Sequence, residues 1–265
     1  MSAPGLGSVD PDVRREQLRA SLAAVHARIE RACADAGRDP AEVTLVVVTK
    51  YFPASDVLLL HELGVRSFGE NRDQEAAEKY AVVRQALADG TDGSDGLDGL
   101  DGADPEGRPV LHFIGRLQGN KATHVARYAD VVESLDRVKL VGGLARGAHR
   151  AGRPPGDLDV LLQVSLDADT SRGGALPEDL DALAAAVAGE PALTLRGLMA
   201  VAPLGADPDA SFATLLDLAR DLRERHPEAS WLSAGMSGDL EAALRHGATH
   251  LRVGTAILGS RPSLL

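Results

Sequence analysis

The sequence contains a single cysteine, Cys33, which excludes an internal disulfide bond. It has no cluster of cysteine and histidine residues at the spacing of a structural zinc site. No window approaches the ~20 apolar residues that a membrane span requires. The N-terminal residues lack the basic region and apolar stretch of a signal peptide. These absences together lead us to expect a soluble, cytoplasmic protein without a metal site.

Aromatic residues are scarce, at 3%, and acidic residues outnumber basic ones, which gives a formal net charge of −11. An acidic chain without a basic stripe and interleaved aromatics is a poor partner for nucleic acid. We therefore expect neither a nucleic-acid nor a membrane partner. A length of 265 residues suits one large α/β domain, and we expect residues 1–265 to form a single domain.

Residues 89–107 stand apart from the rest of the chain, because Asp-Gly pairs recur in them every three residues. So much glycine and like charge cannot offset the entropy lost on ordering, so we predict a disordered acidic loop inserted in the domain. A calcium-binding loop would need the D-x-[DN]-x-[DN]-G spacing and a closing glutamate, and the segment has neither. Residues 1–10 are small, polar and acidic, and we expect a flexible N-terminus there.

Strand-like and helix-like patterns alternate through the remaining sequence, after a first helix expected at 11–36. Strict alternation predicts a parallel sheet, and eight units predict closure into a (β/α)8 TIM barrel with an extra N-terminal helix. The rival fold is a doubly wound open sheet, but no G-x-G-x-x-G follows the first strand. The expected strands are 43–49, 65–69, 110–115, 130–135, 159–166, 195–201, 230–234 and 250–254, and the expected helices between them are 54–63, 72–88, 121–128, 137–151, 177–188, 207–226 and 238–246.

Lys50 stands at the end of the most apolar strand-like run, and it is one of only four lysines in the chain. A lysine at this place has its amine at the mouth of the core, where partial burial favours the neutral form that attacks aldehydes. The competing interpretation is a lysine that ends a strand and extends into water. The residues after the last two strands decide between them.

The loops after strands seven and eight are where barrels commonly bind phosphate. The first loop reads Ser233-Ala234-Gly235-Met236-Ser237-Gly238-Asp239, and the second contains Gly254 and Thr255. Small residues let the backbone approach a ligand, and the first loop opens into a helix with free N–H groups, while the second places a glycine and a hydroxyl at the strand exit. They predict a phosphate cup.

Three other residues at strand ends or within strands are candidates with open alternatives. Arg252 needs a partner if it points into the barrel, either a carboxylate such as Glu70 or a ligand heteroatom. His112 is a core histidine or a catalytic one, and Met199 a core or a pocket residue. A lysine opposite a phosphate cup suggests an aldehyde cofactor bearing phosphate, pyridoxal 5′-phosphate (PLP), although aldolase-type barrels also combine the two features.

Six segments, in order, resemble the YggS/PROSC family of pyridoxal phosphate homeostasis proteins, whose fold is similar to the alanine racemase barrel. The resemblance covers nearly the whole chain from Val43 to Gly259. Its segments are V-V-T-K-Y-F-P (47–53), F-G-E-N-R-D-Q-E (68–75), H-F-I-G-R-L-Q-G-N-K (112–121), R-G-L-M-A (196–200), L-S-A-G-M-S-G-D (232–239) and R-V-G-T-A-I-L-G (252–259).

The resemblance implies a PLP site in which Lys50 holds the cofactor as a covalent aldimine. It implies that Arg252 faces the pyridine nitrogen and that Asn71, His112 and Met199 line the pocket. The phosphate would be surrounded by Ser233, Gly235, Met236, Ser237, Gly254 and Thr255.

The chain departs from the family pattern at three places. Phe52 stands where the family often has a second lysine, and Arg72 stands where a tyrosine is common after G-E-N. The family's S-K-S-G-like turn reads Ser-Arg-Gly-Gly at 171–174. Any role of the second lysine in passing on the cofactor is therefore in doubt here.

Two functions are compatible with this resemblance, and a third is not. The first is a cofactor carrier without robust catalysis, which stores PLP, limits free aldehyde and delivers the cofactor to PLP-dependent apoenzymes. The second is an amino-acid racemase or decarboxylase on the same barrel. Such enzymes carry an additional C-terminal β-domain, for which no room is expected after Gly254, so we favour a monomeric carrier. A pure interaction module would leave the lysine and the cup as coincidences.

Overall fold

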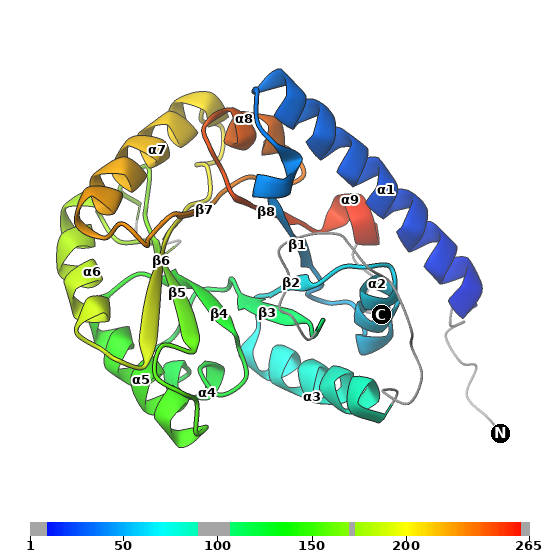
Figure 1. Cartoon of the computed structure of the whole chain (residues 1–265), viewed down its shortest axis with the longest axis horizontal. Coiled ribbons are helices and arrows are strands. Elements are labelled where there is room, and N and C mark those ends of the chain that lie inside the picture. Colours follow the sequence, from blue (N-terminus) through cyan, green and yellow to red (C-terminus); the bar gives the residue numbers. More distant parts are fainter. Residues whose placement is uncertain (1–9, 90–106, 170–172, 261–265) are drawn as a thin grey trace.

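The computed structural model describes residues 10–89, 107–169 and 173–260, and these residues form a closed barrel of eight parallel strands (Figure 1). Each strand pairs with the next in sequence, and the last pairs with the first. The strands are β1 (Thr44–Val48), β2 (Ser67–Glu70), β3 (Val110–Phe113), β4 (Val131–Leu135), β5 (Leu158–Gln163), β6 (Leu193–Met199), β7 (Trp231–Ser233) and β8 (His250–Val253). The predicted (β/α)8 barrel is confirmed.

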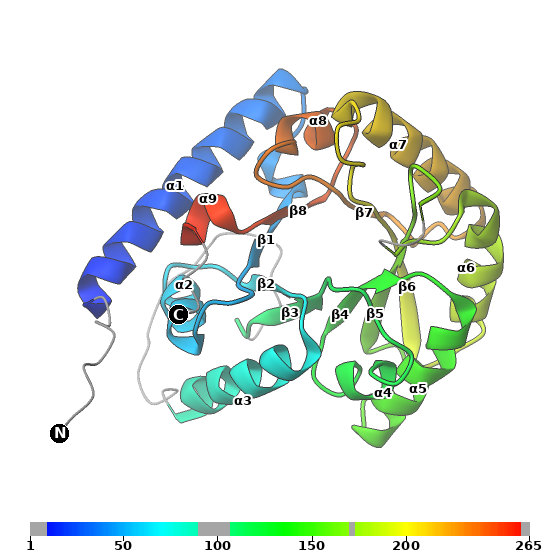
Figure 2. The same ribbon diagram turned by 180° about the vertical axis from the view of Figure 1, so that it is seen from behind.

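Helices surround the ring of strands, as the view from behind also shows (Figure 2). They are α1 (Pro11–Asp35), α2 (Ala54–Glu62), α3 (Asp73–Asp89), α4 (Ala122–Val125), α5 (Val141–Arg150), α6 (Leu180–Ala188), α7 (Pro208–Arg225), α8 (Leu240–Arg245) and α9 (Thr255–Leu258). Short 3₁₀ turns occur at Pro40–Glu42, Val138–Leu140 and Pro177–Asp179.

The strands bury both faces, so their residues alternate between the barrel interior and the layer under the helices. Val47 and Phe68 are fully buried in that outer layer, the main apolar core. Val46 and Val48 point inward, because a Cβ at Gly69 on the neighbouring strand would lie 3.3 Å from a methyl group of each. Each fully buried Val, Leu or Phe contributes about 1.5–3 kcal/mol to the hydrophobic driving force.

The N-terminal helix α1 precedes the eight repeating units and has a well-defined start. The Asp10 carboxylate accepts a hydrogen bond from the Asp12 N–H at 2.9 Å, and Pro11 occupies the first turn, as in many helix N-termini. Its buried stripe is Leu18, Leu22, Val25, Ile29, Ala32 and Cys33. This stripe packs α1 on the barrel, and the helix runs along α8 and α9 (Figures 1 and 2).

Some predicted boundaries were wrong. The helix expected at 121–128 is only the four-residue α4, after which turns with i to i+3 hydrogen bonds lead to Tyr128. The segment expected as a helix at 137–151 begins as a 3₁₀ turn, and α5 starts at Val141. The short α9 was not predicted as a separate element. The predicted flexible N-terminus and acidic loop fall almost entirely outside the described residues.

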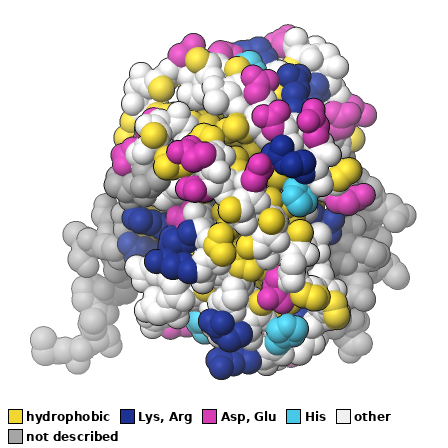
Figure 3. Space-filling model, turned by 90° about the vertical axis from the view of Figure 1, so that its left-hand side faces the viewer, with side chains coloured by type: hydrophobic (Ala, Val, Ile, Leu, Met, Phe, Trp, Pro, Cys, Tyr) yellow, Lys and Arg dark blue, Asp and Glu magenta, His cyan; other side chains and the backbone are white. Residues whose placement is uncertain are grey.

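The surface shown in Figure 3 carries arginine and lysine side chains in separate small groups among acidic and uncharged ones. In the described part of the chain, no helix is both long and apolar enough to cross a membrane.

Candidate functional site

Lys50 lies two residues beyond the end of β1 and is half-buried. It follows the inward-pointing Val46 and Val48 at the same two-residue spacing. Its Nζ is 6.0 Å from the centre of the Tyr51 ring, and Arg72 lies over the same ring with its Cζ at 4.8 Å. Tyr51 itself has a φ of 71°, a left-handed conformation that costs free energy for a residue with a Cβ. The surrounding structure must therefore hold this loop in place.

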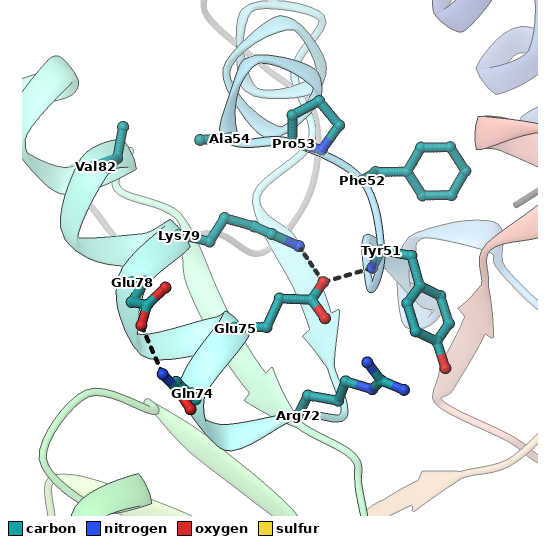
Figure 4. Close-up of a pocket in the computed structure, with 10 residues that line it drawn as sticks. All are labelled: Tyr51, Phe52, Pro53, Ala54, Arg72, Gln74, Glu75, Glu78, Lys79 and Val82. Carbon is teal, nitrogen blue, oxygen red and sulfur yellow. Dashed lines mark hydrogen bonds and ion pairs between the residues drawn. The ribbon is translucent and has the colours of Figure 1, made fainter. Parts of the chain in front are cut away.

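A largely buried ion-pair cluster holds the backbone on both sides of Lys50, and Figure 4 shows its bonds from Lys79 and from the Tyr51 N–H to Glu75. The Lys79 Nζ donates to the Thr49 carbonyl oxygen at 2.9 Å and to Glu70 Oε1 at 2.7 Å. It also bonds Glu75 Oε1 at 3.2 Å, and that oxygen accepts the Tyr51 N–H at 2.6 Å. One cation on α3 thus fixes the residue before Lys50 directly and the residue after it through one carboxylate.

The carboxylate of Glu70 is fully buried in this cluster. Burial raises its pKa, although the charge and hydrogen bond of Lys79 and the hydrogen bond from the Thr49 hydroxyl act in the opposite direction. Its Oε1 receives bonds from both Lys79 and Thr49, whereas its Oε2 has no hydrogen-bond partner among the described residues. The Lys79 ammonium is therefore what makes an ionised Glu70 tolerable.

A second polar network fills the barrel interior. His112 Nδ1 on β3 lies 2.7 Å from Glu133 Oε1 on β4, and the Ser233 hydroxyl on β7 donates to Glu133 Oε2 at 2.6 Å. Arg252 on β8 donates to that hydroxyl and, at 2.8 Å, to the carbonyl oxygen of Ala200. All four side chains are almost inaccessible to solvent. The network ties four strands together across the barrel.

Electrostatics keep the centre of this network ionised. Burial alone would raise the pKa of Glu133, but the hydrogen bond and charge of His112, the charge of Arg252 and the Ser233 hydroxyl lower it to about 2. For His250, burial and the nearby charge of His112 lower the pKa to about 3. Glu133 is thus a carboxylate at neutral pH and His250 a neutral imidazole.

The carboxylate suggested as the structural partner of Arg252 was wrong. Glu70 belongs to Lys79 in the other cluster, and the carboxylate near Arg252 is Glu133, 3.7 Å away. Glu70 pairs with Lys79 because Lys79 on α3 lies next to the end of β2, where Glu70 is located. His112 is buried and hydrogen-bonded to Glu133.

The loop between β7 and α8 contains three of the predicted phosphate-binding residues, and a fourth, Ser233, ends β7. Gly235 has a φ of 90°, and a Cβ there would lie 2.6 Å from the Ala243 Cβ, so only glycine fits. The Met236 N–H is bonded to Asp239 Oδ1 at 2.6 Å. In the described part of the chain, no hydrogen bond engages the N–H groups of Ser237 and Gly238. The fourth residue, Ser233, already uses its hydroxyl inside the barrel.

The connection between β8 and α9 passes close to β1, the strand that precedes Lys50. A Cβ at Gly254 would lie 3.1 Å from the carbonyl oxygen of Val48. Thr255 and Ala256 are exposed, and as the first residues of α9 their N–H groups have no acceptor within the helix.

Strand order brings these residues together. β8 pairs with β1 on one side and with β7 on the other, so Lys50 and both loops lie at neighbouring positions of the same barrel end. Asn71 follows β2, the other neighbour of β1, and its Oδ1 is buried without a partner among the described residues. Met199 ends β6 opposite Ser233 of β7, and it packs against Val131 and Leu161 in the barrel interior.

Lys79, Glu75 and Glu133 were not predicted as parts of the site. A four-residue spacing on a helix signals a Glu75–Lys79 pair, and a glutamate inside the apolar strand Val131–Leu135 signals a buried charge that needs a partner. Neither signal says which strand or loop receives the interaction.

Known proteins are similar to this chain in amino-acid sequence and in the fold of the barrel. The family described as alanine racemase, N-terminal domain, matches residues 20–262. A pyridoxal phosphate homeostasis protein of Mycobacterium tuberculosis is 42% identical over 263 residues, 96% of both chains. One of Escherichia coli is 37% identical over 248 residues, 91% of this chain and 95% of that relative. The structure of PipY from Synechococcus elongatus PCC7942 with PLP bound is 32% identical, with a TM-score of 0.72 over 91% of this chain and 100% of that one. The chain therefore belongs to the family of pyridoxal phosphate homeostasis proteins, which has the alanine racemase N-terminal barrel.

Proposed function

We propose that this protein binds PLP covalently at Lys50 and serves in the storage and delivery of the cofactor inside the cell. The observation that carries the proposal is the placement of a half-buried lysine beside two loops with free N–H groups, at one end of a closed barrel. PipY, a relative of the same fold, has been seen with PLP bound.

The residues at this end of the barrel fit the chemistry of PLP. The cofactor offers an aldehyde for the amine, a phosphate for backbone N–H groups and hydroxyls, and polar ring atoms for side chains. The N–H groups of Ser237, Gly238 and Thr255 are free to donate to an anion. The Asn71 side chain has a buried polar atom that still lacks a partner.

Each residue has a specific role in the proposal. The Lys50 amine would hold the cofactor through its aldehyde, which would supply the carbonyl chemistry of the site. The loops at 233–237 and 254–255 hold the phosphate. Arg252 would face the ring nitrogen and, as a cation, would favour that nitrogen without a proton, which would weaken the ring as an electron sink. Asn71, His112 and Met199 complete the pocket, the last two from inside the barrel.

A carrier is favoured over an enzyme. The relatives at 37–42% identity are named homeostasis proteins, not racemases or decarboxylases. The arginine at the ring nitrogen also suits holding the cofactor better than stabilising a carbanion. In this proposal the protein acts in the cytoplasm as a monomer, and its partners are PLP and, transiently, PLP-dependent apoenzymes.

Borohydride reduction tests the attachment site. Reduction of the PLP-loaded protein, followed by peptide mass mapping, is expected to place the adduct on Lys50 and to find none in Lys50→Ala. Lys139→Ala is the control, because Lys139 is exposed in the turn Val138–Leu140 after β4, a strand that does not pair with β1. An adduct of equal yield on another lysine in Lys50→Ala would contradict the assignment. Assays of racemisation and decarboxylation over a panel of amino acids separate carrier from enzyme.

A further inference from the structure

The helix α1 lies outside the eight repeating units, yet it packs on the two helices that follow the predicted phosphate loops (Figures 1 and 2). α8 begins where the β7–α8 loop ends, and α9 begins directly after Gly254. Because α1 packs on the helices that follow both loops, it can restrain both loops from the outer side of the barrel.

Arg28 of α1 contacts the first loop directly. Its Nη1 donates to the Ser237 carbonyl oxygen at 2.7 Å, and its Nε and Nη2 bind both carboxylate oxygens of Glu241 on α8. This two-pronged arginine–carboxylate pair fixes the plane of the guanidinium, so its third donor has a defined direction. The carbonyl it holds is two residues beyond Gly235, in the centre of the loop.

Arg14, near the start of α1, contacts the other side of the site. It pairs with Asp56 of α2 at 2.6 Å, donates to the Leu258 carbonyl oxygen of α9 at 3.2 Å, and lies over the Phe52 ring with its Cζ at 5.8 Å. The same helix therefore reaches the end of α9 and the loop that follows Lys50. Phe52 is the residue that replaces the family's second lysine.

We propose that α1 is an outer brace of the phosphate-binding loops, and that Arg28 is a positioning residue for the phosphate. Arg28 holds the Ser237 carbonyl oxygen on the outside of the loop, so that the neighbouring N–H groups point to the barrel mouth. Lys50 is held by a different cluster, that of Lys79, so the brace acts on the phosphate and not on the aldehyde. This inference rests on the proposed function.

The test compares PLP with pyridoxal, which has the same aldehyde and no phosphate. In Arg28→Met, the affinity for PLP is expected to fall about tenfold, the equivalent of one charge-assisted hydrogen bond, while the affinity for pyridoxal changes less than about twofold. Arg28→Lys keeps a charge near Glu241 but loses the fork, so it is expected to shift the PLP-to-pyridoxal ratio in the same direction. It also provides a folded variant if Arg28→Met does not fold.

Arg19→Met is the matched control, because Arg19 lies on the same helix and, among the residues that the structure describes, pairs with the exposed Glu16 alone. It is expected to leave both affinities unchanged. Equal weakening of PLP and pyridoxal in the Arg28 variants, or no change in PLP affinity, would overturn the brace. Wild-type protein that binds neither compound would instead refute the proposed function.

Discussion

Removal of the Lys79 ammonium should expose how the loop carrying Lys50 is held. In Lys79→Met, Glu70 keeps its fully buried carboxylate but loses the cation 2.7 Å away, and the Thr49 hydroxyl remains as a donor to it. Breaking a buried ion pair by removing one partner costs about 3–5 kcal/mol. The free energy of unfolding of an ordinary domain is about 5–15 kcal/mol. The variant should therefore still fold, but with a much smaller free energy of unfolding.

The pH dependence identifies Glu70 as the cause. Burial already raises the pKa of Glu70, and loss of Lys79 removes the main opposing influences. A carboxyl with a raised folded-state pKa binds its proton more tightly when folded, so stability is lost as pH rises through that pKa. The cost of Lys79→Met should therefore be largest at pH 7 and should shrink as the pH falls toward 4.5, the ordinary value.

Urea unfolding at neutral and mildly acidic pH measures both effects. The double variant Lys79→Met/Glu70→Gln should recover most of the lost stability, because no charge is then left unpaired. It should still react more slowly with PLP at Lys50, since the Thr49 carbonyl oxygen then loses its bond from α3 and keeps the one from the Phe52 N–H at 3.0 Å. Arg220→Met, which breaks an exposed pair with Asp217, should cost less than about 1 kcal/mol. A cost below about 1 kcal/mol for Lys79→Met, independent of pH, would refute the reasoning.

Two further predictions concern the barrel interior and the phosphate loop. The pKa of Glu133 is lowered from 4.5 to about 2, so its ionised form contributes about 3 kcal/mol above pH 4.5, and this is lost as the pH falls toward 2. Glu133→Gln should be less stable at pH 7, and the difference should shrink in acid unfolding curves; a constant difference would contradict the network. Gly235→Ala should weaken PLP binding and lower the melting temperature, because its φ is 90° and a Cβ would lie 2.6 Å from the Ala243 Cβ. Gly238→Ala, with nothing within 4 Å, should leave the melting temperature unchanged; equal losses would show that backbone strain at Gly235 is not the cause.

The sequence was sufficient to predict the order of strands because each strand is a short apolar run bounded by helical periodicity. The same order places Lys50, Gly235 and Gly254 at one end of the barrel, since a closed ring makes the first strand a neighbour of the last. Boundaries were less predictable where helices are short, as at α4 and α9, because four residues carry no periodicity.

The partners of buried charges could not be predicted from the sequence. Arg252 and Glu133 are far apart in the chain and meet across the barrel, and Glu70 was open to either cation until the position of α3 was known. Similarly, nothing in the residues of α1 shows that Arg28 reaches Ser237, 209 positions away. Such contacts depend on helix placement to within a few ångströms, which a pattern of residue types does not specify.

Cys33 gives the protein a built-in reporter for movement of the brace helix. It is fully buried near the end of α1, and burial raises the pKa of its thiol, so a reagent in solution can modify it only when the helix swings away from the barrel. The rate of thiol labelling thus counts openings of α1 in the native chain, with no introduced probe. A ligand that needs the closed helix must slow the labelling in proportion to its coupling, so the labelling rate of this one sulfur atom would report whether that ligand is bound.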